Sequence, residues 1–237
     1  MTETLVVRGL TKAYRGRTVV DGLDLEVSAG QTVGLLGPNG AGKTTTFEMI
    51  LGLRTQDSGT VGFGRCLDRM PLHRRAALGL GYLPQGPSVF RGLTARENLL
   101  VLLESLKTPV PSCRADELLE RFGLVRLADQ KARTLSGGER RRLEFARALC
   151  SNPKILLVDE PFAGVDPLAV AGISSAVEDM AARGVGVLLT DHTVREALSV
   201  CDRVYVLVDG RIVERGTPDE VRSSEVARRL YLGEDFS

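Results

Sequence analysis

The amino-acid sequence predicts an α/β fold around a largely parallel sheet, and three apolar stretches carry that prediction. The first, residues 31–36, has strand length and leads into a glycine-rich loop and a helical pattern at residues 45–51. The other two, residues 155–158 and 186–190, are equally apolar and are followed by polar residues. Buried parallel strands are continuously apolar, and α/β sheets place their chemistry at the carboxyl ends of such strands. We therefore expect a buried sheet with a functional site along one edge.

Length and composition describe one globular unit, which we expect to span residues 1–237 as a single domain. The chain has 237 residues, of which 43% are hydrophobic and 26% charged, and its net charge is +1. This balance gives no strong field, so we expect no nucleic-acid partner. No apolar run approaches the ~18 residues of a membrane span, so any membrane function needs a separate polypeptide. The four cysteines lack Cys-x-x-Cys spacing, as expected for reduced thiols in a cytoplasmic protein.

The N-terminal part predicts an antiparallel unit. Residues 5–10, 18–20 and 23–27 have strand character, and the last of these alternates apolar and charged side chains, as a half-exposed antiparallel strand does. Tyr14 lies between them in a polar stretch that we expect to be a turn. It is either a half-buried surface residue or a stacking platform for adenine, a contact that contributes about 1–3 kcal/mol. Its place ahead of the strand that precedes the glycine-rich loop favours the platform.

Residues 37–44 have the spacing of a phosphate-binding P-loop, a glycine, four residues and then Gly-Lys-Thr. The glycines let backbone N–H groups point inward at phosphate oxygens, Lys43 adds a cation for the β- and γ-phosphates, and the Thr44 hydroxyl can ligate Mg²⁺. The alternative is a chance glycine-rich turn, but the strand before it and the helix after it argue against that. The candidate ATP-binding residues here are Gly37, Pro38, Asn39, Gly40, Ala41, Gly42, Lys43, Thr44 and Thr45.

A helical region follows a second set of short elements. Residues 60–63 predict a strand, residues 71–77 a short helix, and residues 79–84 a strand that ends at Gln85. From residue 94 to residue 150, helical periodicity replaces the strand patterns. We therefore expect a helical subdomain over about residues 86–150, inserted between two strands of the main sheet.

The sequence Leu-Ser-Gly-Gly-Glu at residues 135–139 introduces the last helix of this subdomain. Ser136 and Glu139 have the spacing of a capping box, which predicts a helix running to about residue 150. Gly137 and Gly138 each destabilise a helix by about 1 kcal/mol relative to alanine, and a cap alone does not require them. Bare backbone N–H groups at a helix N-terminus attract anions, so we expect a second phosphate-binding device here.

Two carboxylates end the strand that begins at residue 155. We expect Asp159 to hold Mg²⁺ through water and Glu160 to face the γ-phosphate and polarise the attacking water. Ordinary solvated acids are the alternative, which fits a single carboxylate better than an adjacent pair. The next strand ends at Asp191 and His192, and we expect His192 to contact the γ-phosphate, whereas His73 is assigned a structural role.

Capping and turn signals complete the chain. Asp166 is expected as the N-cap of a helix that has Pro167 at its first position and runs to about residue 183. Residues 203–214 predict a hairpin, and residues 217–220 predict another capping box. A tail over about residues 224–237 carries acidic residues and two aromatics.

Taken in order, these motifs resemble the ATP-binding subunits of ABC transporters over nearly the whole chain. Tyr14 corresponds to the aromatic loop and residues 37–44 to Walker A, while Gln85 stands where the Q-loop glutamine does. Residues 135–139 match the signature sequence of the family. Residues 155–159 match Walker B, with Glu160 as catalytic acid and His192 as switch histidine.

The resemblance implies a P-loop NTPase with a RecA-like core, an antiparallel β subdomain and an inserted helical subdomain. It implies ATP and Mg²⁺ as cofactors, with Thr44, Gln85 and Asp159 as metal ligands. The implied catalytic residues are Glu160, His192, Gln85 and Lys43, and the implied ATP contacts beyond the P-loop are Tyr14, Ser136, Gly137, Gly138, Glu139 and Asp166. Residues 163–165, Ala-Gly-Val, depart from the Ser-Ala-Leu that many members have before this aspartate.

Within the family, residues 42–47, 82–90 and 231–236 resemble the ATPases of lipopolysaccharide-export transporters. ATPases of branched-chain amino-acid importers are a similar alternative that can share Tyr-Leu-Gly near the end, but the segment around Gln85 and the Gly-Glu-Asp-Phe ending favour the exporter. Non-transport members usually carry two cassettes in one chain or long coiled-coil insertions, which this chain does not. We therefore expect an ATP-hydrolysing transporter subunit on the cytoplasmic face of the inner membrane.

Two expectations concern assembly. A signature on the far side of the helical subdomain cannot easily reach its own P-loop, so we expect a head-to-tail homodimer with composite ATP sites. Residues 86–91 form a loop with two apolar residues, Val89 and Phe90. Phe90 either folds into the core of the helical subdomain or helps to form a groove that receives a cytoplasmic helix of a transmembrane permease subunit. The second reading places the docking site near Phe90.

Overall fold

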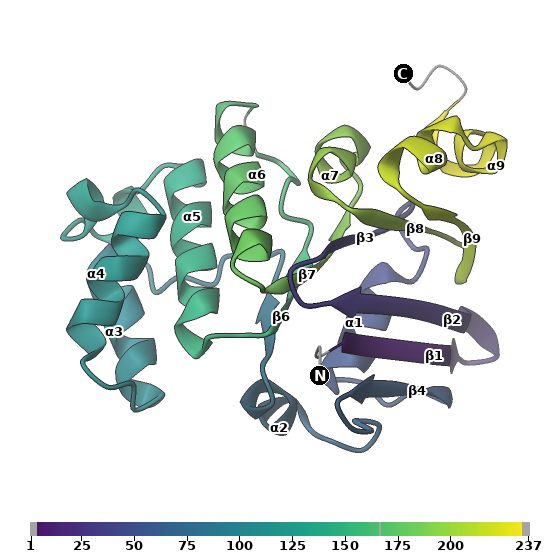
Figure 1. The fold of residues 1–237 in the computed structure, drawn as a ribbon, viewed down its shortest axis with the longest axis horizontal. Helices are drawn as coiled ribbons and strands as arrows, with labels where there is room; N and C mark the ends of the chain where they lie inside the picture. Colours follow the sequence, from purple (N-terminus) through teal and green to yellow (C-terminus); the bar gives the residue numbers. More distant parts are fainter. Residues whose placement is uncertain (1–3, 166, 234–237) are drawn as a thin grey trace.

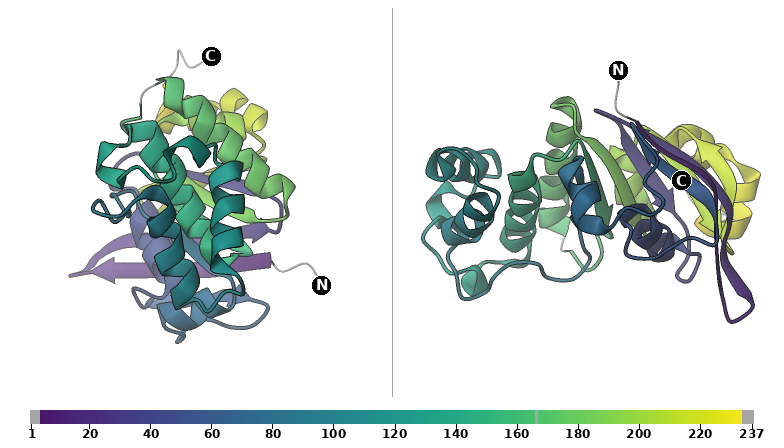
Figure 2. Two further views of the ribbon diagram at one scale, coloured as in Figure 1. Left: turned by 90° about the vertical axis from the view of Figure 1, so that its left-hand side faces the viewer. Right: turned by 90° about the horizontal axis from the view of Figure 1, so that it is seen from below.

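The computed structural model describes residues 4–165 and 167–233. It is an elongated molecule with helices α3 to α6 at one end and a small sheet and the C-terminal helices at the other (Figures 1 and 2). A larger sheet lies between these two ends. The predicted α/β class is confirmed.

The larger sheet has the strand order β5-β6-β7-β3-β8-β9. Its strands are β3 (Thr32–Leu36), β5 (Leu80–Leu83), β6 (Ile155–Asp159), β7 (Gly186–Asp191), β8 (Arg203–Val208) and β9 (Arg211–Gly216). The pairs are parallel up to β8, and β8 and β9 form the predicted hairpin. Strands β3, β6 and β7 are buried along their whole length, as their apolar runs predict. Asp159 pairs with Thr190 and Leu36 with Asp191, so these three strands end at one edge.

The smaller sheet has the order β2-β1-β4 and is antiparallel, as predicted. Its strands are β1 (Thr4–Tyr14), β2 (Arg17–Ser28) and β4 (Ser58–Phe63). The predicted separate short strands are wrong, because β1 and β2 continue through irregular positions that shift their pairing. Tyr14 is therefore the last residue of β1 and pairs with Arg17, whereas residues 15 and 16 make the turn.

The helical end of the molecule follows β5 in the chain and returns to β6. It contains α3 (Ala95–Ser105), α4 (Pro111–Arg121), α5 (Gly137–Ala148) and the short turns η1 (Val125–Leu127), η2 (Ala132–Thr134) and η3 (Leu149–Ser151). The capping box of Ser136 and Glu139 is present, and a second one at Thr94 starts α3. Helix α6 (Pro167–Ala182) lies beside α5 (Figure 1). Asp166, the expected N-cap of α6, lies outside the described residues.

The remaining helices surround the large sheet. They are α1 (Lys43–Leu51), α2 (Leu72–Ala77), α7 (Val194–Val200), α8 (Pro218–Ser223), α9 (Glu225–Ala227) and the π-helical turn η4 (Arg228–Leu232). The described part of the expected tail is folded. Tyr231 and Leu232 pack against the hydrophobic core to which α5, β6 and β7 contribute. Within residues 4–165 and 167–233, no helix combines the length and the apolar character needed to cross a membrane.

Candidate active site

The P-loop leads into the uncapped N-terminus of α1. Gly42 is the N-cap and offers no side-chain hydrogen bond, and the Thr46 N–H donates to the Gly42 carbonyl at 2.9 Å. The N–H groups of the preceding turn, at Lys43, Thr44 and Thr45, have no acceptor inside a helix. They point out of the positive end of the helix dipole, which is the setting in which proteins bind phosphate.

Two glycines of the loop are required by close packing. A Cβ atom on Gly37 would lie 2.0 Å from the carbonyl oxygen of Leu207 in β8. A Cβ atom on Gly42, whose φ is +108°, would lie 2.6 Å from the carbonyl oxygen of Val19 in β2. Strands from both sheets therefore pack closely against the curled loop. A residue with a side chain at either position would clash with these strands and change the loop conformation.

Lys43 is buried beneath this loop. Its Nζ donates to the carbonyl oxygens of Gly37 at 2.7 Å and Pro38 at 3.0 Å. Burial lowers the pKa of Lys43, and the negative charges of Glu160, Asp159 and Asp191 oppose that shift. The ammonium group is thus held by backbone oxygens of the loop, within the field of the acids at the strand ends.

Asp159 is buried at the end of β6, and Thr190 of the neighbouring strand orients it. The Thr190 hydroxyl donates to Asp159 Oδ1 at 2.6 Å, and the Glu160 N–H donates to the Thr190 carbonyl at 2.9 Å. Burial, together with the charge of Asp159, raises the pKa of Tyr82 to about 12, so this phenol stays neutral beside the carboxylate. Sequence reasoning missed Thr190, although its place as the first polar residue after the apolar run of its strand was a usable signal.

Three of the predicted catalytic residues meet at Glu160. The Gln85 side-chain amide donates to Glu160 Oε2 at 2.7 Å, and His192 Nδ1 lies 3.2 Å from the same oxygen. Glu160 has a φ of +44°, a left-handed conformation that is rare for a residue with a side chain and that clusters at functional sites. Gln85 and His192 are exposed. Two polar side chains therefore hold the Glu160 carboxylate in position.

Asp191 ties the loops around this cluster together. Its Oδ2 accepts from the Phe162 N–H, and its Oδ1 accepts from the N–H groups of His192 and Thr193, each at 2.8 Å. The side chain is fully buried. Sequence reasoning noted Asp191 only as the residue before His192, yet it joins the loop after Glu160 to the loop that carries the histidine.

The signature residues lie on the helical end, away from the P-loop. Ser136 and Gly137 are exposed, and Gly137 and Gly138 line a hollow of 300 Å³ together with Gln85 and Glu160. A Cβ on Gly137 would meet no atom within 4 Å, whereas on Gly138 it would lie 2.6 Å from the Cβ of Ala169 in α6. Packing against α6 is therefore a structural reason for glycine at position 138, and the role of both glycines in an anion site stays a prediction.

Two cationic side chains lie beside the ring of Tyr14. The Lys12 ammonium lies 5.6 Å and the Arg54 guanidinium 5.5 Å from the centre of its ring. Its hydroxyl is buried and has no hydrogen-bond partner among the described residues. The ring already contacts cations, as a half-buried surface tyrosine can, and a purine could replace one of them.

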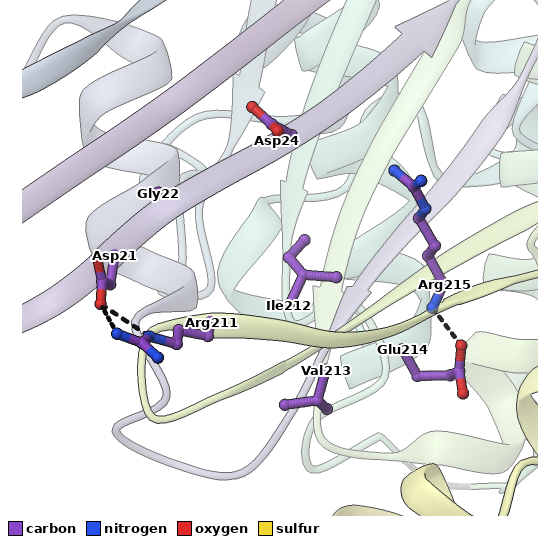
Figure 3. A pocket seen from close by; sticks show the side chains of 8 residues that line it. All are labelled: Asp21, Gly22, Asp24, Arg211, Ile212, Val213, Glu214 and Arg215. Carbon is purple, nitrogen blue, oxygen red and sulfur yellow. Dashed lines mark hydrogen bonds and ion pairs between the residues drawn. The ribbon is translucent and has the colours of Figure 1, made fainter.

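A separate hollow of 460 Å³ lies between β2 and β9 (Figure 3). The ion pair of Asp21 and Arg211, 2.6 Å apart, closes one end of it. The remaining lining residues are Gly22, Asp24, Ile212, Val213, Glu214 and Arg215. None of the predicted site residues lines this hollow, so the chemistry is assigned to the edge formed by β3, β6 and β7.

Comparisons with known proteins give one consistent result. The model of the ABC transporter family matches residues 20–163. The chain is 50% identical, over 98% of each chain, to the lipopolysaccharide export system ATP-binding protein LptB of Haemophilus influenzae. It is 49% identical, again over 98% of each chain, to the protein of the same name from Escherichia coli strain K12. Among solved structures, an ATP-binding cassette of an ABC transporter in its ADP conformation aligns with a TM-score of 0.87 at 28% identity, over 99% of this chain and 100% of that one.

Proposed function

Because this chain belongs to the family of ABC transporter ATPases, we propose that it is the ATP-hydrolysing subunit of a lipopolysaccharide-export transporter on the cytoplasmic face of the inner membrane. The observation that carries the proposal is an identity of 49–50% over 98% of both chains to two proteins named for that export system. An ATPase of a branched-chain amino-acid importer and a non-transport ATPase are the alternatives.

ATP is proposed to bind along the edge where β3, β6 and β7 end. The uncapped first turn of α1 and the buried Lys43 supply donors for the β- and γ-phosphates. Thr44 and Asp159 would hold Mg²⁺, with the Gln85 side chain as a third ligand. The donor set fits, since magnesium sites commonly combine one carboxylate and a hydroxyl with phosphate oxygens and water. A bound Mg²⁺ would neutralise charge that develops on the phosphates.

Glu160 is proposed as the group that polarises the attacking water. Its carboxylate is held by Gln85 and lies beside His192. A base must be fixed within hydrogen-bonding reach of the proton it takes, and these contacts fix it. His192 would contact the γ-phosphate from the loop that Asp191 anchors.

The active assembly is proposed to be a homodimer with two composite sites. Ser136 and Gly137 are exposed on the helical end, whereas the P-loop lies at the edge of the large sheet. A second copy arranged head to tail would bring its signature over the phosphates bound by Lys43. Asp166 lies outside the described residues, and its proposed contact with ATP rests on the sequence motif alone.

ABC transporter ATPases act with transmembrane subunits, and Phe90 is proposed as their docking point. Val89 packs into the core, but Phe90 is 47% exposed and its ring lies 4.6 Å from the Arg147 guanidinium. The Asn98 side chain accepts from the Phe90 N–H at 2.8 Å and donates to its carbonyl, so the loop is fixed while the ring stays outside. Phe90→Ala should lower affinity for the membrane subunits by about 30-fold or more, as loss of an aromatic hot spot does, without lowering the melting temperature.

Depletion of the chain in the bacterium that carries it tests the export function. Newly made lipopolysaccharide should then accumulate in the inner membrane, and the wild-type chain, but not Lys43→Ala, should restore its transfer to the cell surface. Normal transfer during depletion, combined with a failure to take up branched-chain amino acids, would assign the chain to the importer instead.

A further inference from the structure

Side chains of the C-terminal segment, residues 224–233, hold it to β9 and to α8. The Ser224 hydroxyl donates to Glu214 of β9, and the Arg228 guanidinium donates to the carbonyl of Arg222 in α8. The Gly233 N–H donates to the Arg228 carbonyl at 2.9 Å and closes the turn η4. In Figure 1 the segment lies over β8 and β9, close to the sheet edge where β3 ends. Its position is therefore fixed with respect to the ATP site.

Tyr231 points from η4 toward that edge. Its ring packs against the core, and its hydroxyl donates to the carbonyl oxygen of Asp191 across a long contact of 3.5 Å. Burial raises the pKa of Tyr231, the backbone N–H of Gly37 opposes this shift, and the charges of Asp191 and Glu160 add to it. The phenol is thus neutral and able to donate to the Asp191 carbonyl.

The Asp191 carbonyl that accepts from this hydroxyl lies at the start of the loop that carries His192, next to the strand that leads into the P-loop. The Gly37 carbonyl accepts from Lys43 Nζ, and the Asp191 carboxylate holds the N–H groups of His192 and Phe162. Gly37 directly follows Leu36, which pairs with Asp191, so the hydroxyl meets the end of β7 beside the start of the P-loop.

We propose that Tyr231 is a positioning residue that couples the C-terminal segment to the loop of His192 and, through the pairing of β7 with β3, to the P-loop. Through it, binding of nucleotide orders residues 228–233, and displacement of this segment weakens nucleotide binding. Such coupling is reciprocal by thermodynamic necessity. The proposal rests on the assignment of the ATP site made above.

Tyr231→Phe removes the hydroxyl and keeps the ring. We expect kcat/KM for Mg·ATP to fall by about 3- to 10-fold, the range for loss of one hydrogen bond, mainly through a higher KM. Tyr205→Phe is the matched control, because Tyr205 is a buried tyrosine of β8 whose hydroxyl accepts from the Glu26 N–H at 3.4 Å, on the side of the small sheet. It should leave kcat/KM unchanged.

Hydrogen exchange of the full chain with and without Mg·ATP separates coupling from simple packing. In the wild type, nucleotide should slow exchange both in residues 37–46 and in residues 228–233. In Tyr231→Phe the first protection should remain and the second should disappear, while Tyr205→Phe should keep both.

The coupling is refuted if the wild-type segment gains no protection from nucleotide, or if Tyr231→Phe matches Tyr205→Phe in kinetics and exchange. A wild-type chain that fails to hydrolyse ATP would contradict the ATPase assignment instead, so the two failures are distinct.

Discussion

The two halves of the proposed composite ATP site are held in different ways. The P-loop half is pressed between β8 and β2 at Gly37 and Gly42, and its lysine is buried. The signature half is held by a local capping box, and its Ser136 and Gly137 are exposed. A preorganised loop can bind phosphate within one chain, whereas an exposed helix end needs a second surface to exclude water.

This difference predicts which ATP site of the dimer loses activity when either half is mutated. Changes to the P-loop half should alter binding or chemistry in every subunit that carries them. Changes to the signature half should act on the opposite site of a dimer.

Glu160→Gln keeps the shape of the side chain and removes its basicity. Hydrolysis should fall about 10²- to 10⁴-fold, because general-base catalysis contributes that much. Binding of ATP should persist, since Lys43 and Thr44 are untouched, so the variant should accumulate as an ATP-loaded dimer. Single-turnover kinetics and size-exclusion chromatography with ATP measure the two effects. Turnover near the wild-type rate would remove the role from Glu160.

Mixing two inactive variants tests the division between the halves directly. Lys43→Ala damages the P-loop half and Ser136→Arg the signature half, so each homodimer should be inactive. A mixed dimer keeps one intact site, and equal mixing should restore about a quarter of wild-type ATPase activity if chains pair at random. The control is each variant at the same total concentration. No recovery after verified subunit exchange would contradict the head-to-tail arrangement.

The adjacent signature glycines should respond differently to alanine. Gly138→Ala brings a Cβ within 2.6 Å of Ala169 and should destabilise the fold by about 1–3 kcal/mol, as overpacking does. Gly137→Ala meets open space, so the melting temperature should hold while ATPase activity falls about 10-fold or more, as when a phosphate-facing backbone is obstructed. Thermal unfolding and steady-state kinetics of the pair provide the comparison. Full activity of Gly137→Ala would mean that no phosphate approaches this backbone.

Sequence patterns predicted those parts of the site that are formed within one short segment of the chain. The strand, loop and helix around Lys43, the acids at the end of β6 and the capping box at Ser136 all follow from spacing within one segment. The fold class followed from the same apolar runs.

Contacts between distant segments could not be predicted in this way. The sequence does not reveal that Thr190 meets Asp159, or that Asp191 fastens the Phe162 loop, because strand register decides both. Continuation of β1 and β2 through irregular pairing was missed for a related reason, since glycines in a strand resemble breaks. Packing of Gly138 against α6 also depends on tertiary approach.

Thr190→Val tests how far the P-loop half depends on such a contact. Valine has nearly the same shape, but Asp159 Oδ1 loses a donor at 2.6 Å and Glu160 loses part of its backbone anchor, since its N–H also lies 3.3 Å from the Thr190 hydroxyl. Hydrogen bonds to charged groups contribute about 1.5–3 kcal/mol, so the free energy of unfolding should fall by about that amount. ATPase activity should fall about 3- to 30-fold as the Mg²⁺ ligand and the base lose their fixed geometry. Thr32→Val, at a buried threonine at the opposite end of β3, is the control and should keep wild-type kcat. If Thr190→Val loses stability but keeps kcat, Thr190 stabilises the sheet without orienting the acids. The geometry of Asp159 and Glu160 would then not depend on this contact.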